Sequence, residues 1–242
     1  MNTLLEIKNL GMLWTINSDS VQKCLSECSM EYKLKSVAEF DGKSEKKVKK
    51  DTFVGQIGEM MWYTFLQSMN IPCAVPDFKQ HDPRKSNMVR EKLWDRDLPL
   101  QCNITKIFKN NREIKLDRHT YVKSQTLISA SKFKPSIFIQ KRHYDEKKRK
   151  YRKEDNILNS NRNVLFLFAL IDAPEDLFSV NNYNGYLSMG FWPTIKKYFL
   201  NEPFLKKYSD KKYAVYLEKL KDNNKLIIDP KEFFEKNIII ES

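Results

Sequence analysis

The residues that could do chemistry in this sequence are acidic side chains at two marked places in its first half. Glu59 directly follows two glycines, Gly55 and Gly58, that stand three residues apart. Asp95 and Asp97 form a second acidic group just before a stretch with strand-like alternation. Carboxylate oxygens are the ligands that hard divalent cations such as Mg2+ prefer, and a metal held in this way can polarise a phosphate and activate a water. The chemistry therefore depends on which elements carry these residues.

A long helix is predicted over residues 53–69, which include both glycines and Glu59. Its apolar residues recur at helical spacing, and the Asn70–Pro72 segment ends it. Trp62 and Leu66 lie away from the main apolar stripe, which indicates a helix packed by other elements on both sides.

Strands and shorter helices are predicted after this helix. Alternation predicts strands at 98–108 and 112–116, joined by a turn, and a helix at 124–133 precedes a strand at 135–140. The most apolar run, 163–171, is expected in the middle of a sheet, buried on both faces. A further strand is expected near 183–188, and lysine-rich helices near 192–199 and 213–220. This order predicts an α/β fold in which helices sandwich a sheet.

The charge balance indicates a polyanionic partner. Lys and Arg number 43 against 31 Asp and Glu, a net charge of +12. Half of the excess lies in residues 141–153, where eight basic residues face two acidic ones and two tyrosines, Tyr144 and Tyr151, interleave. This segment is either a solvated hairpin tip or a loop that grips phosphates. The lysine cluster at 43–50 is a second candidate rim for phosphates.

With these motifs in this order, residues 50–190 resemble the PD-(D/E)XK nuclease superfamily, which includes many restriction enzymes, resolvases and phage endonucleases. The resemblance lies in the Gly-x-x-Gly-Glu helix start, the acidic group before a strand, and the stretch from Lys123 through a short helix to Gln140. It implies a restriction-endonuclease-like core with a mixed central sheet flanked by helices. We expect an N-terminal helical segment at 1–40, the core at 41–190 and a basic helical C-terminal extension at 191–242.

The resemblance also implies a metal site. Glu59 matches the helix glutamate of the superfamily, Asp97 its metal-binding aspartate and Gln101 the first residue of its Glu/Gln-x-Lys element. These three residues would hold Mg2+, with Mn2+ as a substitute. Plainer interpretations remain open, because Glu59 also suits a helix start and Asp97 a turn, and Asp95 could replace Asp97.

The catalytic lysine is where the sequence departs from the superfamily. Asn103 stands where the pattern starting at Gln101 would have lysine. Three other lysines are candidates, of which Lys123, in Tyr-Val-Lys, and Lys106 are preferred over Lys115, in Glu-Ile-Lys close to the turn.

The resemblance implies a Mg2+-dependent endonuclease acting on double-stranded DNA, either a type II restriction enzyme or a phage nuclease. A homodimer is expected, since double-strand cleavage needs two sites. The first alternative is a catalytically degenerate protein of the same fold that binds DNA or RNA without cutting. The second is a basic protein that contacts RNA in a large assembly.

Other classes of protein are excluded or disfavoured by what the sequence lacks. The longest apolar run, at 164–171, is too short to cross a bilayer, and the N-terminus has no pattern of a secretory signal. A cytoplasmic protein with reduced cysteines is therefore expected. Cys24 and Cys28 have no second pair with zinc-ligand spacing, and no phosphate-binding loop of an NTPase occurs.

Overall fold

The structure is a computed structural model of the chain. It describes residues 4–17, 19, 44–73, 105–109, 112–116, 120–140, 144–145, 150–151, 163–173, 180–192, 194–198 and 212–240. Its helices are α1 (Leu4–Lys8), α4 (Glu45–Ser68), α6 (Leu127–Phe133), α9 (Leu217–Asp222) and α10 (Pro230–Asn237), with a 3-10 turn η4 (Ile195–Tyr198). The strands are β1 (Met12–Asn17), β2 (Thr105–Lys109), β3 (Arg112–Lys115), β4 (Thr120–Thr126), β5 (Ser136–Gln140), β6 (Tyr144–Asp145), β7 (Lys150–Tyr151), β8 (Leu165–Asp172), β9 (Asn182–Phe191), β10 (Lys212–Tyr216) and β11 (Ile238–Ile240).

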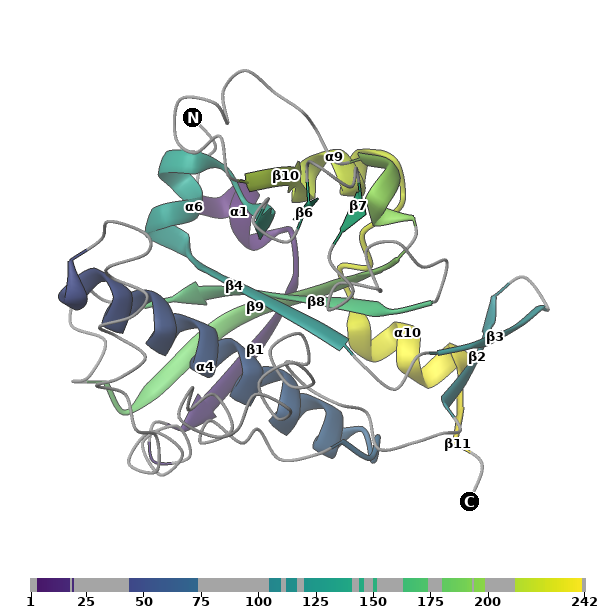
Figure 1. Cartoon of the computed structure of the whole chain (residues 1–242). Coiled ribbons are helices and arrows are strands. Elements are labelled where there is room, and N and C mark those ends of the chain that lie inside the picture. Colours follow the sequence, from purple (N-terminus) through teal and green to yellow (C-terminus); the bar gives the residue numbers. More distant parts are fainter. Residues whose placement is uncertain are drawn as a thin grey trace, which may run out of the picture.

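A mixed sheet of four strands forms the centre of the molecule, in the order β1-β9-β8-β4 (Figure 1). Strand β4 runs parallel to β8, whereas β8 and β9, and β9 and β1, are antiparallel. The side chains of β8 are buried from Leu165 to Ile171, as expected of an inner strand covered on both faces. The structure thus confirms an α/β fold with a mixed sheet flanked by helices and confirms the inner position of this apolar strand.

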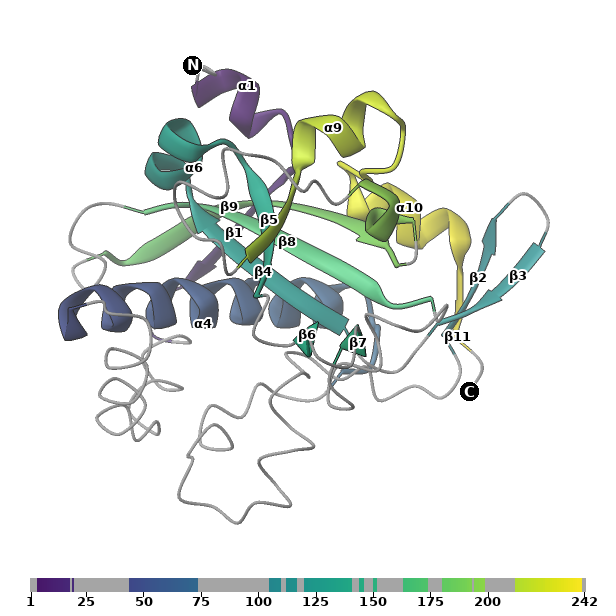
Figure 2. The same ribbon diagram turned by 45° about the horizontal axis from the view of Figure 1, so that its top comes forward.

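Two hydrophobic cores lie on the two faces of this sheet. Helix α4 covers one face, and α1, α6, α9 and the β5–β10 pair lie over the other (Figure 2). Neighbouring residues of β4 point to opposite faces, so that Val122 belongs to the core under α4 and Tyr121 to the other. We call these the α4 core and the α6 core.

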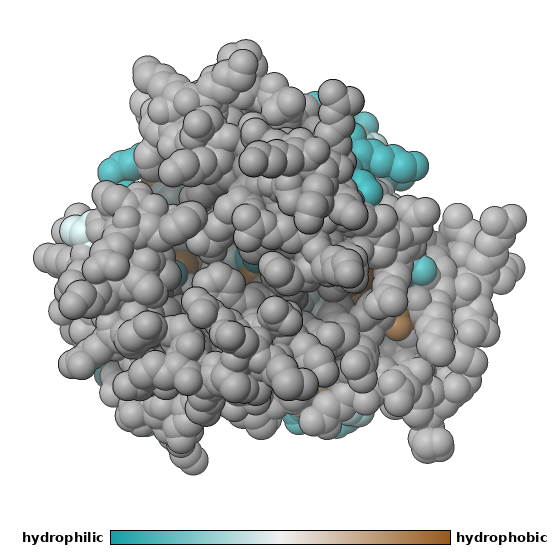
Figure 3. Space-filling view, viewed as in Figure 1, coloured by the Kyte–Doolittle hydropathy of each residue, from teal (hydrophilic) through white to brown (hydrophobic). Residues whose placement is uncertain are grey.

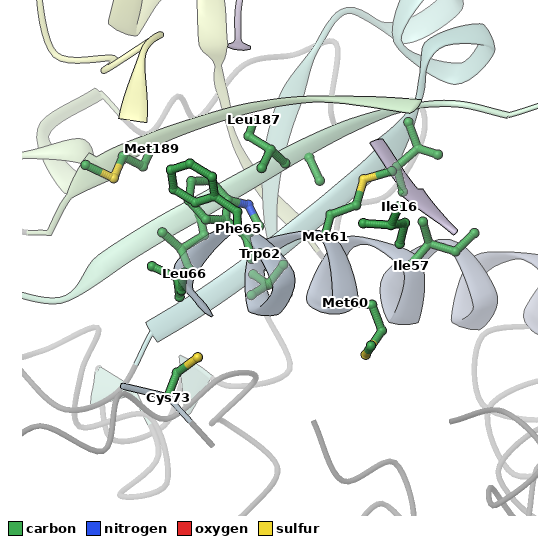
Figure 4. Packing of buried hydrophobic residues seen from close by; sticks show 14 of the residues in the cluster. Ile16, Ile57, Met60, Met61, Trp62, Phe65, Leu66, Cys73, Leu187 and Met189 are labelled. Carbon is green, nitrogen blue, oxygen red and sulfur yellow. The ribbon is translucent and has the colours of Figure 1, made fainter. Parts of the chain in front are cut away.

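Helix α4 confirms the predicted long helix, but it begins at Glu45, so the Gly-x-x-Gly-Glu motif lies inside the helix and not, as was expected, at its start. The Ser44 side chain caps its first turn by accepting a hydrogen bond from the Lys47 N–H at 3.3 Å, and Asn70 follows its end with a positive φ of 55°. Several large side chains of α4 point into the sheet, whereas Met60 points away from it, although it is only 4% exposed (Figure 4). The helix is therefore buried on more than its sheet side, as predicted.

The Trp62 indole fixes α4 to the central strand. Its Nε1 donates a hydrogen bond to the Phe168 carbonyl of β8 at 3.1 Å, and the side chain is fully buried. The ring also lies edge-on to Phe65, with 5.5 Å between centroids. The indole of Trp62 is thus buried without leaving its N–H unpaired, because the Phe168 carbonyl accepts the hydrogen bond.

The predicted hairpin is present, but it belongs to a small sheet that is separate from the central four-stranded sheet. Strands β2 and β3 pair antiparallel with Lys106 opposite Lys115, and β11 adds a third strand to β2. The hairpin projects beyond α10 (Figures 1 and 2). The short β6–β7 pair, with Tyr144 opposite Tyr151, lies within the basic 141–153 segment.

Three predicted helices differ from the structure. The described residues of the helix expected near 192–199 contain only the 3-10 turn η4. The helix expected at 124–133 begins only at Leu127, because residues up to Thr126 continue β4 and the Thr126 hydroxyl caps the helix by accepting from the Ser129 N–H at 3.2 Å. The helix expected at 213–220 is strand β10, paired with β5, followed by α9.

The expected terminal segments also supply strands. The segment 1–40, expected to be helical, contains β1 besides α1, and β1 pairs with β9. The C-terminal extension, expected to be helical, contains β10 and β11 besides α9 and α10.

Candidate functional site

Gly58 and Ser124 form the point at which α4 lies closest to β4. A Cβ atom on Gly58 would stand 1.8 Å from Ser124 Oγ and 2.9 Å from Ser124 Cβ, a distance that no side chain allows. A Cβ on Gly55, one turn earlier, would meet nothing within 4 Å. Of these two glycines, Gly58 is therefore the one that lets the helix approach the strand.

This contact lays the helix that carries Glu59 on β4. Glu59 is half-buried on α4 and follows Gly58 directly. Lys123 is half-buried on β4 and precedes Ser124 directly, so the two predicted site residues lie on touching elements.

The side chain of Lys123 lies on the face of the sheet opposite α4. Its Nζ stands 5.4 Å from the centroid of the Tyr121 ring, and that ring belongs to the α6 core, stacked on Phe166 with 5.0 Å between centroids. A lysine over the face of an aromatic ring is stabilised by the ring quadrupole. The structure therefore brings Glu59 and Lys123 to neighbouring elements but not to one face of the sheet.

The other predicted site residues stand differently. Asp97 and Gln101 lie outside the described residues, as do Asp95 and Asn103. Lys106 and Lys115 face each other in the backbone register of the β2–β3 hairpin, away from β4. Of the three candidate lysines, Lys123 is on the strand that contacts α4.

The described residues do not by themselves fit a Mg2+ site. Mg2+ takes six oxygen ligands, of which proteins usually supply one or two carboxylates, while waters and substrate phosphates supply the rest. Within the described ranges, no group of three or more His, Cys, Asp or Glu side chains could hold a metal ion. Glu59 could supply one carboxylate, and the remaining predicted ligands are Asp97 and Gln101.

Gln125 is a structural clamp that sequence reasoning did not single out. Its Nε2 donates to the Lys134 carbonyl at 3.2 Å and to Ser129 Oγ at 3.4 Å, and its Oε1 accepts from the Ser136 N–H at 3.1 Å. These bonds join the end of β4 to α6 and to the start of β5. A glutamine uses both its donor and its acceptor in this way only when tertiary structure brings the partners together, so no local pattern in the sequence marks it.

Lys134, whose carbonyl Gln125 holds, has a strained backbone. Its φ is 65° and its ψ is 147°, a combination that costs residues other than glycine roughly 1–3 kcal/mol. The Ser136 hydroxyl also donates to the Lys134 carbonyl at 3.2 Å. The exposed ammonium group of Lys134 lies 5.1 Å from the centroid of the Tyr216 ring.

Comparisons of the chain with protein-family models, curated proteins and solved structures gave no match. No helix within the described part of the chain has the length and apolar character needed to cross a membrane.

Proposed function

We propose that this chain is an endonuclease that hydrolyses phosphodiester bonds of double-stranded DNA with Mg2+, in the cytoplasm. The proposal rests on the contact between Gly58 and Ser124, which lays the helix that carries Glu59 on the strand that carries Lys123. In the superfamily that the sequence resembles, a glutamate on such a helix and a lysine on such a strand serve one site. The net charge of +12 supports a polyanionic substrate.

Each residue of the proposed site has a role that follows from its chemistry. Asp97 and Gln101 would hold the metal together with Glu59, and the metal would supply polarisation of the scissile phosphate. Lys123 would offset negative charge that develops on that phosphate. We assign this role to Lys123 rather than to Lys106 or Lys115 because β4 contacts α4, whereas those two lysines belong to a separate sheet.

The second candidate is a protein of this kind that binds DNA or RNA without cutting. One observation of the structure favours it: the Lys123 side chain lies on the face of the sheet opposite α4. Asn103, at the position where the pattern of the resembled superfamily has lysine, has the same implication.

Cleavage of a supercoiled plasmid tests the proposal. The purified protein is incubated with Mg2+ or Mn2+ and, as a control, with EDTA, beside the variants Glu59→Gln, Asp97→Asn and Lys123→Met. We expect cleavage that EDTA abolishes and that each of these substitutions lowers about 100-fold or more. The matched controls are Glu235→Gln and Lys231→Met on α10, which remove an exposed carboxylate and an exposed lysine elsewhere and should cut as the parent does.

The outcome separates the two candidates. Failure of the parent to cut with either metal, or cleavage that the three substitutions leave intact, contradicts the endonuclease proposal. A protein that retards DNA on a gel in EDTA but never cuts it is the degenerate binder. Cleavage that appears only in an Asn103→Lys variant would instead mean that the catalytic lysine belongs at position 103 and that Asn103 inactivates the parent protein.

The proposed homodimer has its own measurement. Double-strand cleavage needs two active sites related by symmetry, so sedimentation in the presence of DNA should give two chains per duplex. A single chain bound per duplex, together with nicked rather than linear plasmid, would contradict the dimer and leave the cleavage proposal intact.

A further inference from the structure

Seven exposed lysines lie on the side of the central sheet opposite α4. We call them the lysine surface, and they belong to α6 and the turn after it, to η4, and to α9 and the turn after it: Lys132, Lys134, Lys196, Lys197, Lys219, Lys221 and Lys225. The same segments, residues 127–134, 194–198 and 217–225, carry two carboxylates, Glu218 and Asp222. This part of the molecule is therefore strongly positive.

The segments that carry these lysines lie side by side. Helix α9 contacts η4, and the Lys134 ammonium stands over the ring of Tyr216, the residue that precedes α9. Lys221 Nζ donates to the Asn9 carbonyl at 3.3 Å, which joins α9 to the end of α1, and α1 contacts α6. Figure 2 shows α6, β5, β10 and α9 together over this face, and Figure 3 shows hydrophilic residues where Figure 1 draws α9 and η4.

The lysines of the lysine surface differ from those of helix α10 in their ion pairing. On α10, Lys231 pairs with Glu235 and Lys236 with Glu232. Within the described ranges, none of the seven lysines of the lysine surface takes part in an ion pair. Their positive charge is thus not neutralised by a described carboxylate, whereas that of α10 is.

Aromatic rings support two of these lysines. Lys134 lies 5.1 Å from the centroid of Tyr216, and Lys196 lies 5.8 Å from that of Trp192. Contact with a ring holds a lysine against the surface, so less rotamer freedom is lost when its ammonium group binds an anion. The ring leaves the ammonium charge in place.

The strained backbone of Lys134 is a separate observation that points to its side chain. Glycine would adopt the φ of 65° without strain, and the Gln125 and Ser136 side chains hold the Lys134 carbonyl whatever side chain position 134 carries. Lys134 is the C-cap of α6, where glycine is common, and what its side chain adds to the described fold is the contact with Tyr216. Strained residues of this kind cluster at functional sites.

We propose that the lysine surface binds the phosphate backbone of double-stranded DNA and that Lys134 lies at its inner end. The inference rests on the proposed function, because the lysine surface continues from Lys134 towards Lys123, the lysine of the proposed active site. Lys123 and Gln125 share one face of β4, two residues apart, and the Gln125 side chain holds Lys134. Phosphates on the lysine surface would thus direct the duplex towards the edge of the sheet formed by β4.

Binding to a short duplex in EDTA, where a metal-dependent enzyme cannot cut, tests this surface. The variant Lys197→Gln/Lys219→Gln removes two charges from the lysine surface, and Lys231→Gln/Lys236→Gln removes two from α10. Fluorescence anisotropy over a range of salt concentrations should show the first variant binding about 10-fold more weakly, with a salt slope lower by about 2. The α10 variant should stay within about twofold of the parent, because its lysines are already paired.

The variant Lys134→Gly separates function from folding. It should leave the melting temperature unchanged or higher, because glycine relieves the strain, and should weaken DNA binding several-fold. Loss of stability without loss of affinity would assign Lys134 to the fold and overturn its place in the surface. Equal losses of affinity in the lysine-surface and α10 variants would overturn the surface as a whole.

The plasmid assay and a vesicle control keep this inference distinct from the proposed function. A protein that cuts DNA while the lysine-surface variants bind it as the parent does is an endonuclease with a different DNA-binding surface. A parent that binds DNA through these lysines but never cuts it supports the surface and contradicts the endonuclease. Lysine-dependent binding to phosphatidylserine vesicles with none to the duplex would overturn the inference in favour of a membrane surface.

Discussion

Gly58 on α4 and Ser124 on β4 meet so closely that the distance between helix and strand is set by the missing side chain of the glycine. A Cβ atom added to Gly58 would come within 1.8 Å of Ser124 Oγ and 3.3 Å of the Ala169 methyl group on β8. Helix α4 therefore rests on two strands at a point where neither partner can give way without moving backbone.

Gly58→Ala should accordingly destabilise the fold, although alanine is the better helix former. We expect the free energy of unfolding to fall by about 1–3 kcal/mol, because the methyl group forces α4 away from β4. Urea unfolding followed by circular dichroism measures this loss. The control is Gly55→Ala, which meets no neighbour and should gain about 0.5–1 kcal/mol. The same sign for both variants would show that the contact does not limit the approach of the helix.

Gln125→Ala should lower stability by about 1–3 kcal/mol, because it removes a donor and an acceptor that join β4, α6 and β5. Gln67→Ala is a suitable control, since that side chain is exposed and, among the residues that the structure describes, its amide makes one long contact, 3.5 Å to Cys73 Sγ. Thermal unfolding of the two variants should show a lower midpoint only for Gln125→Ala. An unchanged midpoint would mean that water satisfies the partners of Gln125 as well as the glutamine does.

Trp62→Phe should cost about 2–4 kcal/mol, through lost volume in the α4 core and the lost hydrogen bond to the Phe168 carbonyl. Trp14→Phe changes the same side-chain type, but Trp14 is only half-buried and its indole donates to Thr64 Oγ1, so its cost should be smaller. Denaturant midpoints of the two variants give the comparison. Similar midpoints would contradict a special role of Trp62 as the link between α4 and β8.

Lys8 should titrate above its ordinary pKa. A hydrogen bond to Tyr186 and then the charge of Asp172, 3.4 Å away, raise the pKa of Lys8 above 10.5. Because the pKa is higher in the folded than in the unfolded state, the stabilisation is complete below pH 10.5 and is lost as the pH rises through the folded-state pKa. NMR titration of the lysine side-chain carbons should show the Lys8 pKa fall in an Asp172→Asn variant.

The same titration contains its control. The pKa of Lys236 is raised by a hydrogen bond to Glu232 and should not respond to the change at Asp172. A Lys8 pKa that is identical in the parent and in Asp172→Asn would leave Tyr186 as its main cause and remove Asp172 from the explanation.

The elements that the sequence predicted correctly are those whose signal is local and repeated. Helix α4 carries apolar residues repeated at helical spacing, and β8 is apolar from Leu165 to Ile171, so each is recognisable without knowledge of its neighbours. The β2–β3 hairpin was recognisable because its turn and its two strands are adjacent in the chain.

The errors concern elements whose partners are remote. Residues 212–216 were expected to be helical, yet they pair with β5, far back in the chain, and the Val215 side chain is fully buried by that arrangement. Ser124 was expected in a helix, but pairing with β8 keeps it in strand β4. The helix begins only after Thr126, whose hydroxyl caps it. The sheet that holds β2 and β3 depends on β11, near the C-terminus. In each case tertiary pairing overrides local propensity.

The candidate site was predictable only in part for the same reason. The Gly-x-x-Gly-Glu motif indicated a helix start beside a site, whereas the close contact of Gly58 with Ser124 is visible only in the structure. The face on which Lys123 lies depends on the register of β4, which the sequence leaves open to shifts of one residue. The metal-ligand roles of Asp97 and Gln101 stay predictions.

The pairing of β1 with β9 has a consequence for how the chain is made. Met12 lies opposite Leu187, so β1 finds its partner only when residues 182–191 have left the ribosome. Until then β1 has no strand to pair with, and α4, which also packs on the earlier strands β4 and β8, lacks the part of its core that β9 supplies. Pairing over such a separation is slow. Nascent chains cut before β9 should therefore depend on chaperones and be sensitive to proteases, whereas chains that include β9 can close the central sheet.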